Sequence, residues 1–567
     1  MLLKSFPSSA FPASFRGSRQ LASVRNPVQS SIAWFGTNSR KAELFRQARD
    51  TFTQAVRADS ATDALDTGAL QLIADLSRLT DGKVAAVIEA NNTAGQTPAP
   101  ASTSALKSRV LASIERLSRG LLERETEVRL LLLASLCSEH LLLLGPPGTA
   151  KSELSRRLNG LVGGAYFERL LTRFSVPEEL FGPLSMKGLE NDEYVRQTAG
   201  YLPTAEVAFI DEIFKANSAI LNALLTLLNE RLFDNGNQRL EAPLLTLVGA
   251  SNELPESEEL DALFDRFLLR RSVSRVSNGN AGALARLAAG RSAPLTPLAE
   301  GGAAAEGLSL DDFKHTAPAA YKAVDVPEAV VELLVELRNW LQDKCEPPVT
   351  VSDRRFMKAV QLLQVAAYGD AREEVDEYDV LLLEHVFGNR PDDSVKVRAK
   401  VLELISSDPG LQQAEMVLLG LFGRGARLVN AAAGASSSAA GAEAAAELPA
   451  AAEEASGLVE LLAARHAALA AQLEAPDGGF PSLRRSVWQA PSSAQAAVQT
   501  LTPQITENRK KVEELLREAQ TLSDCLSRAA QGGVPAGVLE KLLPKRAKQY
   551  AKGISQAPQA LAGAAAR

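Results

Sequence analysis

The segment GPPGTAKS, residues 145–152, limits the possible folds of this chain more than any other feature. It follows the apolar run HLLLLG and opens the helical pattern SELSRRL, so it joins a strand to a helix. Gly145 and Gly148 permit a tight turn that points backbone N–H groups at phosphates, and Lys151 can reach the outer phosphates. The Ser152 hydroxyl suits Mg²⁺. We therefore expect a P-loop that binds ATP and Mg²⁺, formed by Gly145, Pro146, Pro147, Gly148, Thr149, Ala150, Lys151 and Ser152.

A second motif, VAFIDE at residues 207–212, is an apolar strand that ends in two adjacent carboxylates. An acid pair at a strand end is common by itself, but it is far more specific downstream of a P-loop. Asp211 suits the coordination of Mg²⁺ through water, and Glu212 suits the orientation of an attacking water molecule. This Walker B arrangement predicts hydrolysis of ATP in addition to binding.

Polar positions after the next strand fit the same chemistry. The strand LLTLVGAS ends before Asn252, whose amide can contact the attacking water or the terminal phosphate, although alone it would be a turn residue. In ALFDRFLLRR we favour Arg266 as an arginine finger, a guanidinium that neutralises charge on the nucleotide of a neighbouring subunit. Arg270 in the same role, or both arginines as surface charges of a helix, are the alternatives.

A further pair of arginines lies in SDRRF, where Ser352 is the expected N-cap of a helix. Arg354 and Arg355 then occupy the first helical turn, where cations oppose the helix dipole and need another reason to be present. We expect Arg354 to reach back to the bound phosphates, with Arg355 as the alternative.

Helical runs alternate with short apolar strands over residues 107–275, which predicts an α/β domain with a parallel sheet covered by helices. The five strands are HLLLLG, AYFERLL, VAFID, LLTLVGAS and FLLRRSVS. An Ala/Gly/Pro-rich linker is expected over 276–325 and an all-α lid over 326–410. Mostly helical extensions flank this unit: a helical segment and linker (43–106), a helix with a low-complexity linker (411–456), and a C-terminal helical or coiled-coil module with a basic tail (457–567).

The Ala-rich stretch at 431–456 has too few large apolar residues to build a core, so it predicts a linker. Beyond it, apolar residues recur at roughly heptad spacing, which predicts an amphipathic helix packed within its own subunit. These residues are Ile505, Val512, Leu515, Ala519, Leu522 and Leu526. The basic stretch 541–552 is expected to be a solvated tail, with an acidic partner or a membrane surface as the alternative.

The composition excludes several classes of function. The chain has 61 Lys and Arg against 68 Asp and Glu, a net charge of −7, so it lacks the basic field of a nucleic-acid binder. The three cysteines and four histidines lie too far apart in the sequence for a metal or redox motif. No apolar run reaches the ~20 residues of a membrane span, so a transmembrane protein is not expected.

Residues 1–42 are rich in serine, contain basic residues and have no acidic residue before Glu43. This composition is typical of an organellar transit peptide, and the serine content favours a chloroplast over a mitochondrial destination. A disordered basic tail is the alternative.

Over residues 107–400 the motifs together resemble the RavA-like group of MoxR AAA+ ATPases. The resemblance is carried by GPPGTAKS, LTRFSVPEELFGPLS, GYLPTAEVAFIDEIFKANSAILNALLTLLNERLF, SNELPE, DALFDRFLLR and VSDRRF. It implies a P-loop AAA+ αβα sandwich with Walker A at 145–152, Walker B at Asp211 and Glu212, sensor 1 at Asn252, the finger at Arg266 and sensor 2 at Arg354. MoxR-type loops share Ala150 in place of the usual second glycine.

The resemblance also implies an excursion within FGPLSMKGLENDEYVRQTAGYLP and a hairpin before sensor 1, and such hairpins touch the substrate or partner in related rings. In RLFDNGNQRLEA the favoured turn Asn235-Gly236 lies between two short arms.

Such proteins are similar in forming hexameric rings, in working with a partner that carries a von Willebrand factor A (vWA) domain, and in helping client protein complexes to assemble. The expected function is therefore a chaperone-like remodelling ATPase that forms a homo-oligomer. A magnesium-chelatase-like motor subunit and a nucleotide-gated scaffold without turnover are the alternatives. Residues 431–567 do not match the partner-binding domain of RavA, so its partners are not expected here.

Overall fold

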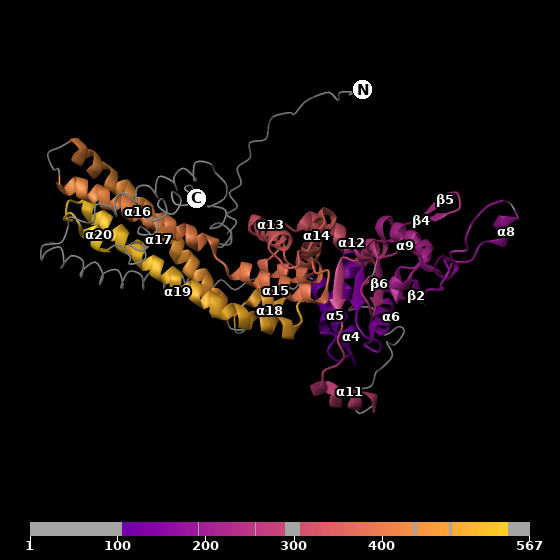
Figure 1. Cartoon of the computed structure of the whole chain (residues 1–567). Coiled ribbons are helices and arrows are strands. Elements are labelled where there is room, and N and C mark those ends of the chain that lie inside the picture. Colours follow the sequence, from indigo (N-terminus) through magenta and orange to yellow (C-terminus); the bar gives the residue numbers. More distant parts are fainter. Residues whose placement is uncertain are drawn as a thin grey trace, which may run out of the picture.

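The computed structural model describes residues 105–542, except 191, 256, 290–306, 435–438 and 476–478. The expected transit peptide (1–42), nearly all of the helical segment at 43–106, and the basic stretch beyond residue 542 lie outside the described residues. Figure 1 shows a compact domain around the sheet, with an elongated helical arm extending from it.

The centre of the domain is a five-stranded parallel sheet with the order β2-β3-β6-β1-β7, as the strand pattern predicts. The strands are β1 (Leu141–Leu144), β2 (Tyr166–Leu170), β3 (Val207–Asp211), β6 (Thr246–Ser251) and β7 (Leu269–Ser272). The three central strands are almost entirely buried because helices cover both faces, which explains why they are continuous apolar runs.

Helices cover the two faces of the sheet in two groups. They are α4 (Ala105–Ser118), α5 (Glu125–Leu136), α6 (Lys151–Val162), α9 (Ser218–Glu230) and α10 (Glu258–Phe264). Successive residues of β1 point to opposite faces: Leu143 joins the apolar cluster of Leu131 in α5, and Leu142 joins that of Leu224 in α9. This arrangement confirms the predicted αβα sandwich.

Shorter elements lie in the segments that link the main helices and strands. They are α7 (Glu178–Phe181), α8 (Met186–Leu189), η1 (Leu202–Thr204), η2 (Ile213–Lys215), β4 (Leu232–Asn235), β5 (Gln238–Glu241), η3 (Asn278–Asn280) and α11 (Ala281–Ala288).

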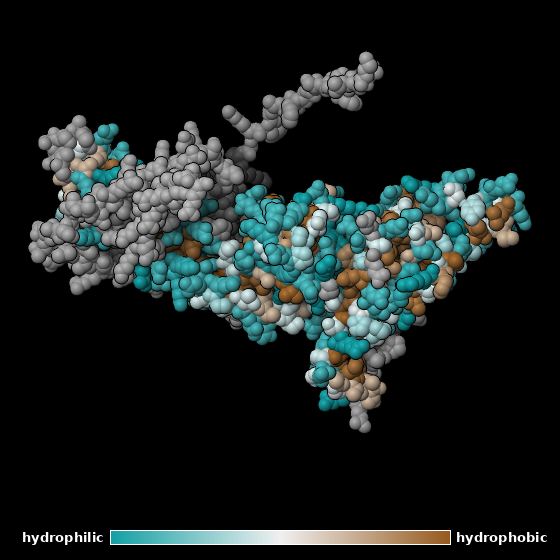
Figure 2. Space-filling view, viewed as in Figure 1, coloured by the Kyte–Doolittle hydropathy of each residue, from teal (hydrophilic) through white to brown (hydrophobic). Residues whose placement is uncertain are grey.

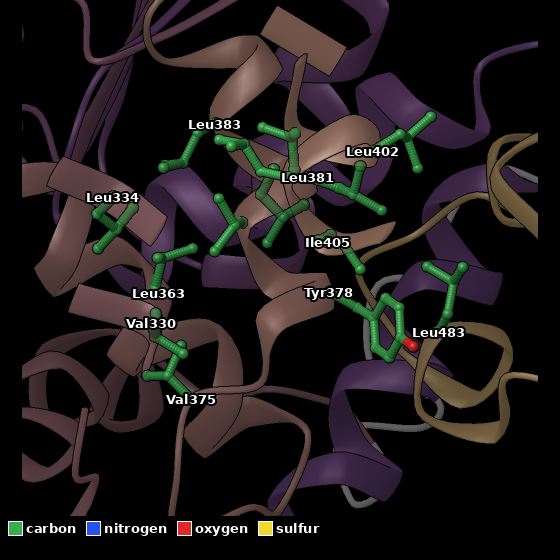
Figure 3. Packing of buried hydrophobic residues seen from close by; sticks show 14 of the residues in the cluster. Val330, Leu334, Leu363, Val375, Tyr378, Leu381, Leu383, Leu402, Ile405 and Leu483 are labelled. Atoms are coloured by element: carbon green, nitrogen blue, oxygen red, sulfur yellow. The ribbon is translucent and has the colours of Figure 1, made fainter. Parts of the chain in front are cut away.

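The lid that follows is helical and packs around one apolar core. Its elements are α12 (Leu310–Ala323), α13 (Glu328–Asp343), α14 (Asp353–Gly369), η4 (Glu377–His385) and α15 (Pro391–Ser406). Figure 3 shows side chains from α13, α14, η4 and α15 meeting in this core, with Val330, Leu363, Leu381 and Leu402 among them.

The lid begins earlier than the sequence pattern predicts, because α12 falls inside the range expected as a linker (276–325). A capping box between Ser309 and Asp312 starts this helix, and Phe313, Ala317 and Ala320 form its buried stripe. Two of these three apolar residues are alanines and Pro318 lies within the helix, so the helical pattern is weak in the sequence.

The arm consists of three long helices that lie side by side, with short helices at each end (Figure 1). Its elements are α16 (Pro409–Gly434), α17 (Ala439–Leu473), α18 (Pro481–Arg485), α19 (Pro491–Ala530) and α20 (Val538–Leu542). The amphipathic helix predicted from the heptad-like spacing is α19, and all six of its predicted apolar positions are buried within the chain.

The expectation of a low-complexity linker over 431–456 is wrong from residue 439 onward, because this stretch is the first half of α17. Leu448, Ala451 and Ala455 are each at most 1 % exposed. Alanine has the highest helix propensity, and its small side chain lets neighbouring helices pack closely. Few large side chains are therefore needed here to form a core.

The arm is attached to the lid at the start of α19. The indole of Trp488 is buried and donates its Nε1–H to the carbonyl oxygen of Ala366 in α14 at 2.7 Å. Gly369 leaves room for this ring, since a Cβ there would lie 2.7 Å from it. Arg398 in α15 donates to the carbonyl oxygen of Ser493 at 2.8 Å, so the arm and the lid share one interface.

One stretch of the described residues, Asp392–Ala433, contains an 18-residue window with a mean hydropathy of 1.2, which is long and apolar enough to cross a membrane. Half of that window is buried inside the structure. The core helix of a soluble protein also meets these criteria of length and composition, so they are weak evidence for a membrane span.

Candidate nucleotide-binding site

The loop between β1 and α6 has the backbone shape that a phosphate cradle needs. Gly145 (φ 154°) has no room for a side chain, since a Cβ would lie 2.2 Å from the carbonyl oxygen of Val273. Gly148 (φ 76°) faces open space. Ala150 adopts the left-handed conformation (φ 67°) immediately before α6, so the turn is closed without the usual second glycine.

Lys151 lies in this loop with only 7 % of the residue exposed. Its Nζ donates to the carbonyl oxygen of Gly145 at 2.5 Å and to Asn252 Oδ1 at 3.3 Å. Burial lowers the pKa of the Lys151 ammonium, and the nearby carboxylates of Asp211 and Glu212 oppose that shift. The predicted Walker A and Walker B residues are therefore brought together.

Glu212 is held from two sides at the end of β3. Its Oε1 accepts a hydrogen bond from Asn252 Nδ2 at 2.7 Å, and its Oε2 lies 3.3 Å from Lys215 Nζ. Glu212 itself has a left-handed backbone (φ 54°), which is strained for a non-glycine residue and turns its side chain toward Asn252. Lys151, Asn252 and Glu212 thus form one chain of contacts.

Strand order explains why these residues meet. The sheet places β6 between β3 and β1, so the carboxyl ends that carry Asp211, Asn252 and the P-loop are adjacent at one edge. Asp211 and Ser152 are both half-buried there, and both offer the oxygen ligands that Mg²⁺ prefers. The residues present therefore fit a Mg²⁺–nucleotide, with Gly148 leaving open space beside the loop.

Two residues that sequence reasoning missed support this edge. Arg124 is 5 % exposed, and its guanidinium donates to the carbonyl oxygens of Thr149 at 3.1 Å and Ser274 at 2.7 Å, so it fastens the P-loop to the segment after β7. Lys215 pairs with Glu212 as described above. The contact of Lys215 could have been predicted from its position three residues after Glu212. The contacts of Arg124 could not, because its partners are distant in the sequence.

Arg266 and Arg354 lie at the opposite edge of the sheet. Arg266 comes just before β7, whose first residue pairs in parallel with Leu141, so it is near the amino end of β1, whereas the P-loop follows the carboxyl end. Burial lowers the pKa of His140 at that same end, with a small further contribution from the charge of Arg354, and burial together with Arg354 lowers the pKa of Arg266. Arg354 therefore lies beside Arg266 and away from the P-loop, whereas the sequence pattern predicts that it contacts the bound phosphates.

The alternative arginines are held within the chain. Arg270 is 7 % exposed and donates to the carbonyl oxygens of Phe264, Phe267 and Gly388 at 2.9–3.2 Å. Arg355 is 4 % exposed and lies 3.2 Å from Asp265. By contrast, no hydrogen bond or ion pair within the described residues holds the guanidinium of Arg354. In each pair, Arg266 and Arg354 are therefore the arginines whose guanidiniums are not held by hydrogen bonds or ion pairs among the described residues.

The expected hairpin and excursion are both present and are joined to each other. The hairpin turn is centred on Gly236 (φ 62°) and Asn237, one residue later than the predicted Asn235-Gly236 pair. Asn235 is buried instead, and its side-chain amide pairs with both backbone groups of Arg196, at 2.7 and 3.1 Å. The hairpin is thereby fixed to the excursion between α7 and η1.

The end of that excursion exposes apolar side chains. Met186, Leu189 and Tyr194 are 72 %, 42 % and 62 % exposed. Figure 2 shows hydrophobic surface at this end of the molecule, where Figure 1 places α8. Exposed apolar side chains at a protruding tip are typical of a contact surface.

The sequence matches known families in two parts. Residues 108–305 match the MoxR domain in the MoxR-vWA-beta-propeller ternary systems, and residues 329–401 match an AAA lid domain. Two uncharacterized proteins of Methanocaldococcus jannaschii are 40 % and 39 % identical over 306 residues, which is 53 % of this chain and 78 % and 77 % of theirs. Protein MoxR of Paracoccus denitrificans is 30 % identical over 152 residues, 26 % of this chain and 44 % of that protein.

These matches cover the sheet, the P-loop and the lid, and they agree with the five-stranded αβα fold and with the site built on it. The chain belongs to the MoxR family of AAA+ ATPases.

Proposed function

We propose that this chain hydrolyses ATP with Mg²⁺ in a ring of identical subunits and uses the hydrolysis to remodel client protein complexes or help them assemble. One observation carries this proposal. The site is divided between two edges of the sheet, with Lys151, Glu212 and Asn252 at one edge and Arg266 and Arg354 at the other. A single subunit cannot complete its own site, whereas a neighbour can.

The division of labour follows from the contacts. When bound, Mg²⁺–ATP supplies the scissile phosphate bond and the metal charge. Ser152 and Asp211 would hold the metal. The Nζ of Lys151, which donates to the carbonyl oxygen of Gly145 in this structure, would donate to phosphate oxygens instead. Glu212, held by Asn252 and Lys215, would orient the attacking water.

A closed ring gives every site one arginine donor from the next subunit, which favours cyclic symmetry over an open chain. The resemblance to RavA-like proteins suggests six subunits, and this narrower grouping is itself part of the proposal. A guanidinium supplied across the boundary stabilises transition-state charge and is worth about 10³- to 10⁵-fold in rate.

A partner with a vWA domain fits the family match, since the matched MoxR domain is described from systems that contain vWA and β-propeller proteins. We propose that such a partner, or the client, contacts the joined hairpin and excursion. Asn235 fixes the two together, and Met186 and Tyr194 expose apolar surface at the tip.

A mixing experiment tests the divided site. Arg266→Ala chains keep an intact P-loop edge, and Glu212→Gln chains keep intact arginines. Each alone should turn over ATP slowly while still binding it, and a mixture that exchanges subunits should regain activity. If the mixture stayed inactive despite demonstrated exchange, the ring proposal would give way to a scaffold that binds nucleotide without turnover.

A further inference from the structure

We propose that Asn389, in the loop between η4 and α15 of the lid, is a positioning residue for the two arginines offered to the neighbouring subunit. This inference rests on the proposed function, because it assigns a role to the edge that carries Arg266 and Arg354.

The side chain of Asn389 joins the sheet to the lid through one oxygen atom. Its Oδ1 accepts hydrogen bonds from Arg270 Nη1 at 2.9 Å and from Arg355 Nη1 at 3.0 Å. Arg270 belongs to β7 and Arg355 to the first turn of α14, so one amide connects the strand and the helix. Within the same loop, the carbonyl oxygen of Gly388 also accepts from Arg270 at 3.2 Å.

These two guanidiniums lie next to Arg266 and Arg354, which are both half-buried. Arg355 directly follows Arg354 and lies 3.2 Å from Asp265, the residue directly before Arg266. Arg270 in turn donates to the carbonyl oxygens of Phe264 and Phe267, on either side of Asp265 and Arg266, and stacks on the Phe264 ring at 3.6 Å. The segment carrying Arg266 is therefore held on both sides by residues that Asn389 anchors.

The charge balance at this edge explains why an anchor is needed. Four guanidiniums gather here, those of Arg266, Arg270, Arg354 and Arg355, and Asp265 forms an ion pair with one of them, Arg355, at 3.2 Å. Burial lowers the pKa of both Arg266 and Arg355, and the nearby charge of Arg354 lowers that of Arg266 further. Without acceptor oxygens to hold them, like charges would move these side chains apart.

The expected consequence is a defect that appears only in the neighbouring site. Asn389→Ala removes the shared acceptor but leaves the P-loop edge of its own subunit untouched. Turnover of the homogeneous variant should fall about 10- to 100-fold, as expected for misplaced positioning groups, while ATP binding to each subunit stays unchanged. Asn389→Asp keeps an acceptor oxygen at the same place and should recover most of the turnover.

Mixing identifies which edge is affected. Asn389→Ala with Glu212→Gln should regain activity, because the Asn389→Ala subunits keep Glu212 and receive intact arginines from their neighbours. Asn389→Ala with Arg266→Ala should stay inactive, because neither variant can offer correctly placed arginines to its neighbour. Asp392→Ala, an exposed position in the first turn of α15, is the matched control and should behave as the wild type.

Each outcome supports or overturns the assignment. Wild-type turnover in Asn389→Ala overturns it, and so does Asn389→Ala that fails to complement Glu212→Gln while Arg266→Ala succeeds. Asn389→Gln displaces the amide by one methylene and is tested in parallel. It must also complement Glu212→Gln and fail to complement Arg266→Ala. This second variant guards against a folding defect of Asn389→Ala. If Arg266→Ala also failed to complement Glu212→Gln, the divided site itself would be wrong.

Discussion

At the residue scale, unusual backbone conformations mark the P-loop and the Walker B motif. Ala150 in the P-loop and Glu212 in Walker B both have positive φ angles, 67° and 54°. A left-handed conformation costs about 1–2 kcal/mol for a residue with a Cβ. Strain of this kind persists where the surroundings over-determine it, and here Glu212 is gripped by Asn252 and Lys215.

Substitutions in these motifs should separate binding from turnover. Lys151→Ala removes the ammonium that would contact the phosphates and should weaken ATP binding. Glu212→Gln keeps the shape and the contact with Asn252, so it should bind ATP normally but turn over at least about 100-fold more slowly. Calorimetric titration and a phosphate-release assay measure the two effects. Wild-type turnover in Glu212→Gln would rule out its assigned role.

At the element scale, α17 shows how an alanine-rich segment can be a core helix. Ala455 and Ala463 are fully buried between neighbouring helices, whereas Gly457, on the same helix, faces open space. The same composition would suit a flexible linker, and only the helices that pack against it turn its small side chains into an interface.

Two substitutions in α17 should therefore have opposite effects on stability. Ala455→Leu inserts a large side chain between packed helices and should lower the free energy of unfolding by about 1–3 kcal/mol. Gly457→Ala adds only a methyl group in open space within a helix and should raise it by about 0.5–1 kcal/mol. Chemical denaturation measures both. If α17 were a linker, neither substitution would change stability.

At the scale of the whole molecule, a buried histidine ties the sheet together. His140, 1 % exposed, precedes β1; its Nδ1 accepts from the backbone N–H of Leu247 at 3.0 Å, and its Nε2 lies 3.1 Å from the carbonyl oxygen of Leu228. Burial and the charge of Arg231 hold the pKa of His140 well below its usual value of 6.5. The ring is therefore neutral in the folded chain, and protonation would break the bond to Leu247.

This depressed pKa makes folding pH-dependent with a defined sign. Below about pH 6.5 the unfolded chain protonates His140 while the folded chain does not, so stability is lost as the pH falls, by up to about 1.4 kcal/mol per pH unit. His140→Asn keeps an acceptor but cannot titrate. Its stability should depend on pH less steeply than that of the wild type, by about that amount, in denaturation curves measured below pH 6.5. Equal slopes would show that His140 is protonated in the folded state.

The local motifs could be predicted because each depends on residues close in sequence. The P-loop, the Walker B acids and Asn252 each follow an apolar strand, and in the structure Lys151, Asn252 and Glu212 are joined by hydrogen bonds. The heptad-like apolar residues of α19 were equally visible, because helical periodicity is a local property. The sequence by itself therefore determined the nucleotide edge of the site and the αβα fold that carries it.

Only the tertiary structure decided which arginines are held inside the chain and at which end of the sheet they lie. Arg266 and Arg270 are both arginines in one short segment, and so are Arg354 and Arg355. The difference lies in carbonyl, amide and carboxylate acceptors that come from distant elements, such as Asn389. The same applies to α12 and α17, whose alanines become core residues only against their partner helices. Burial and the choice of hydrogen-bond partner are set by packing between distant segments, and a pattern along the chain does not contain them.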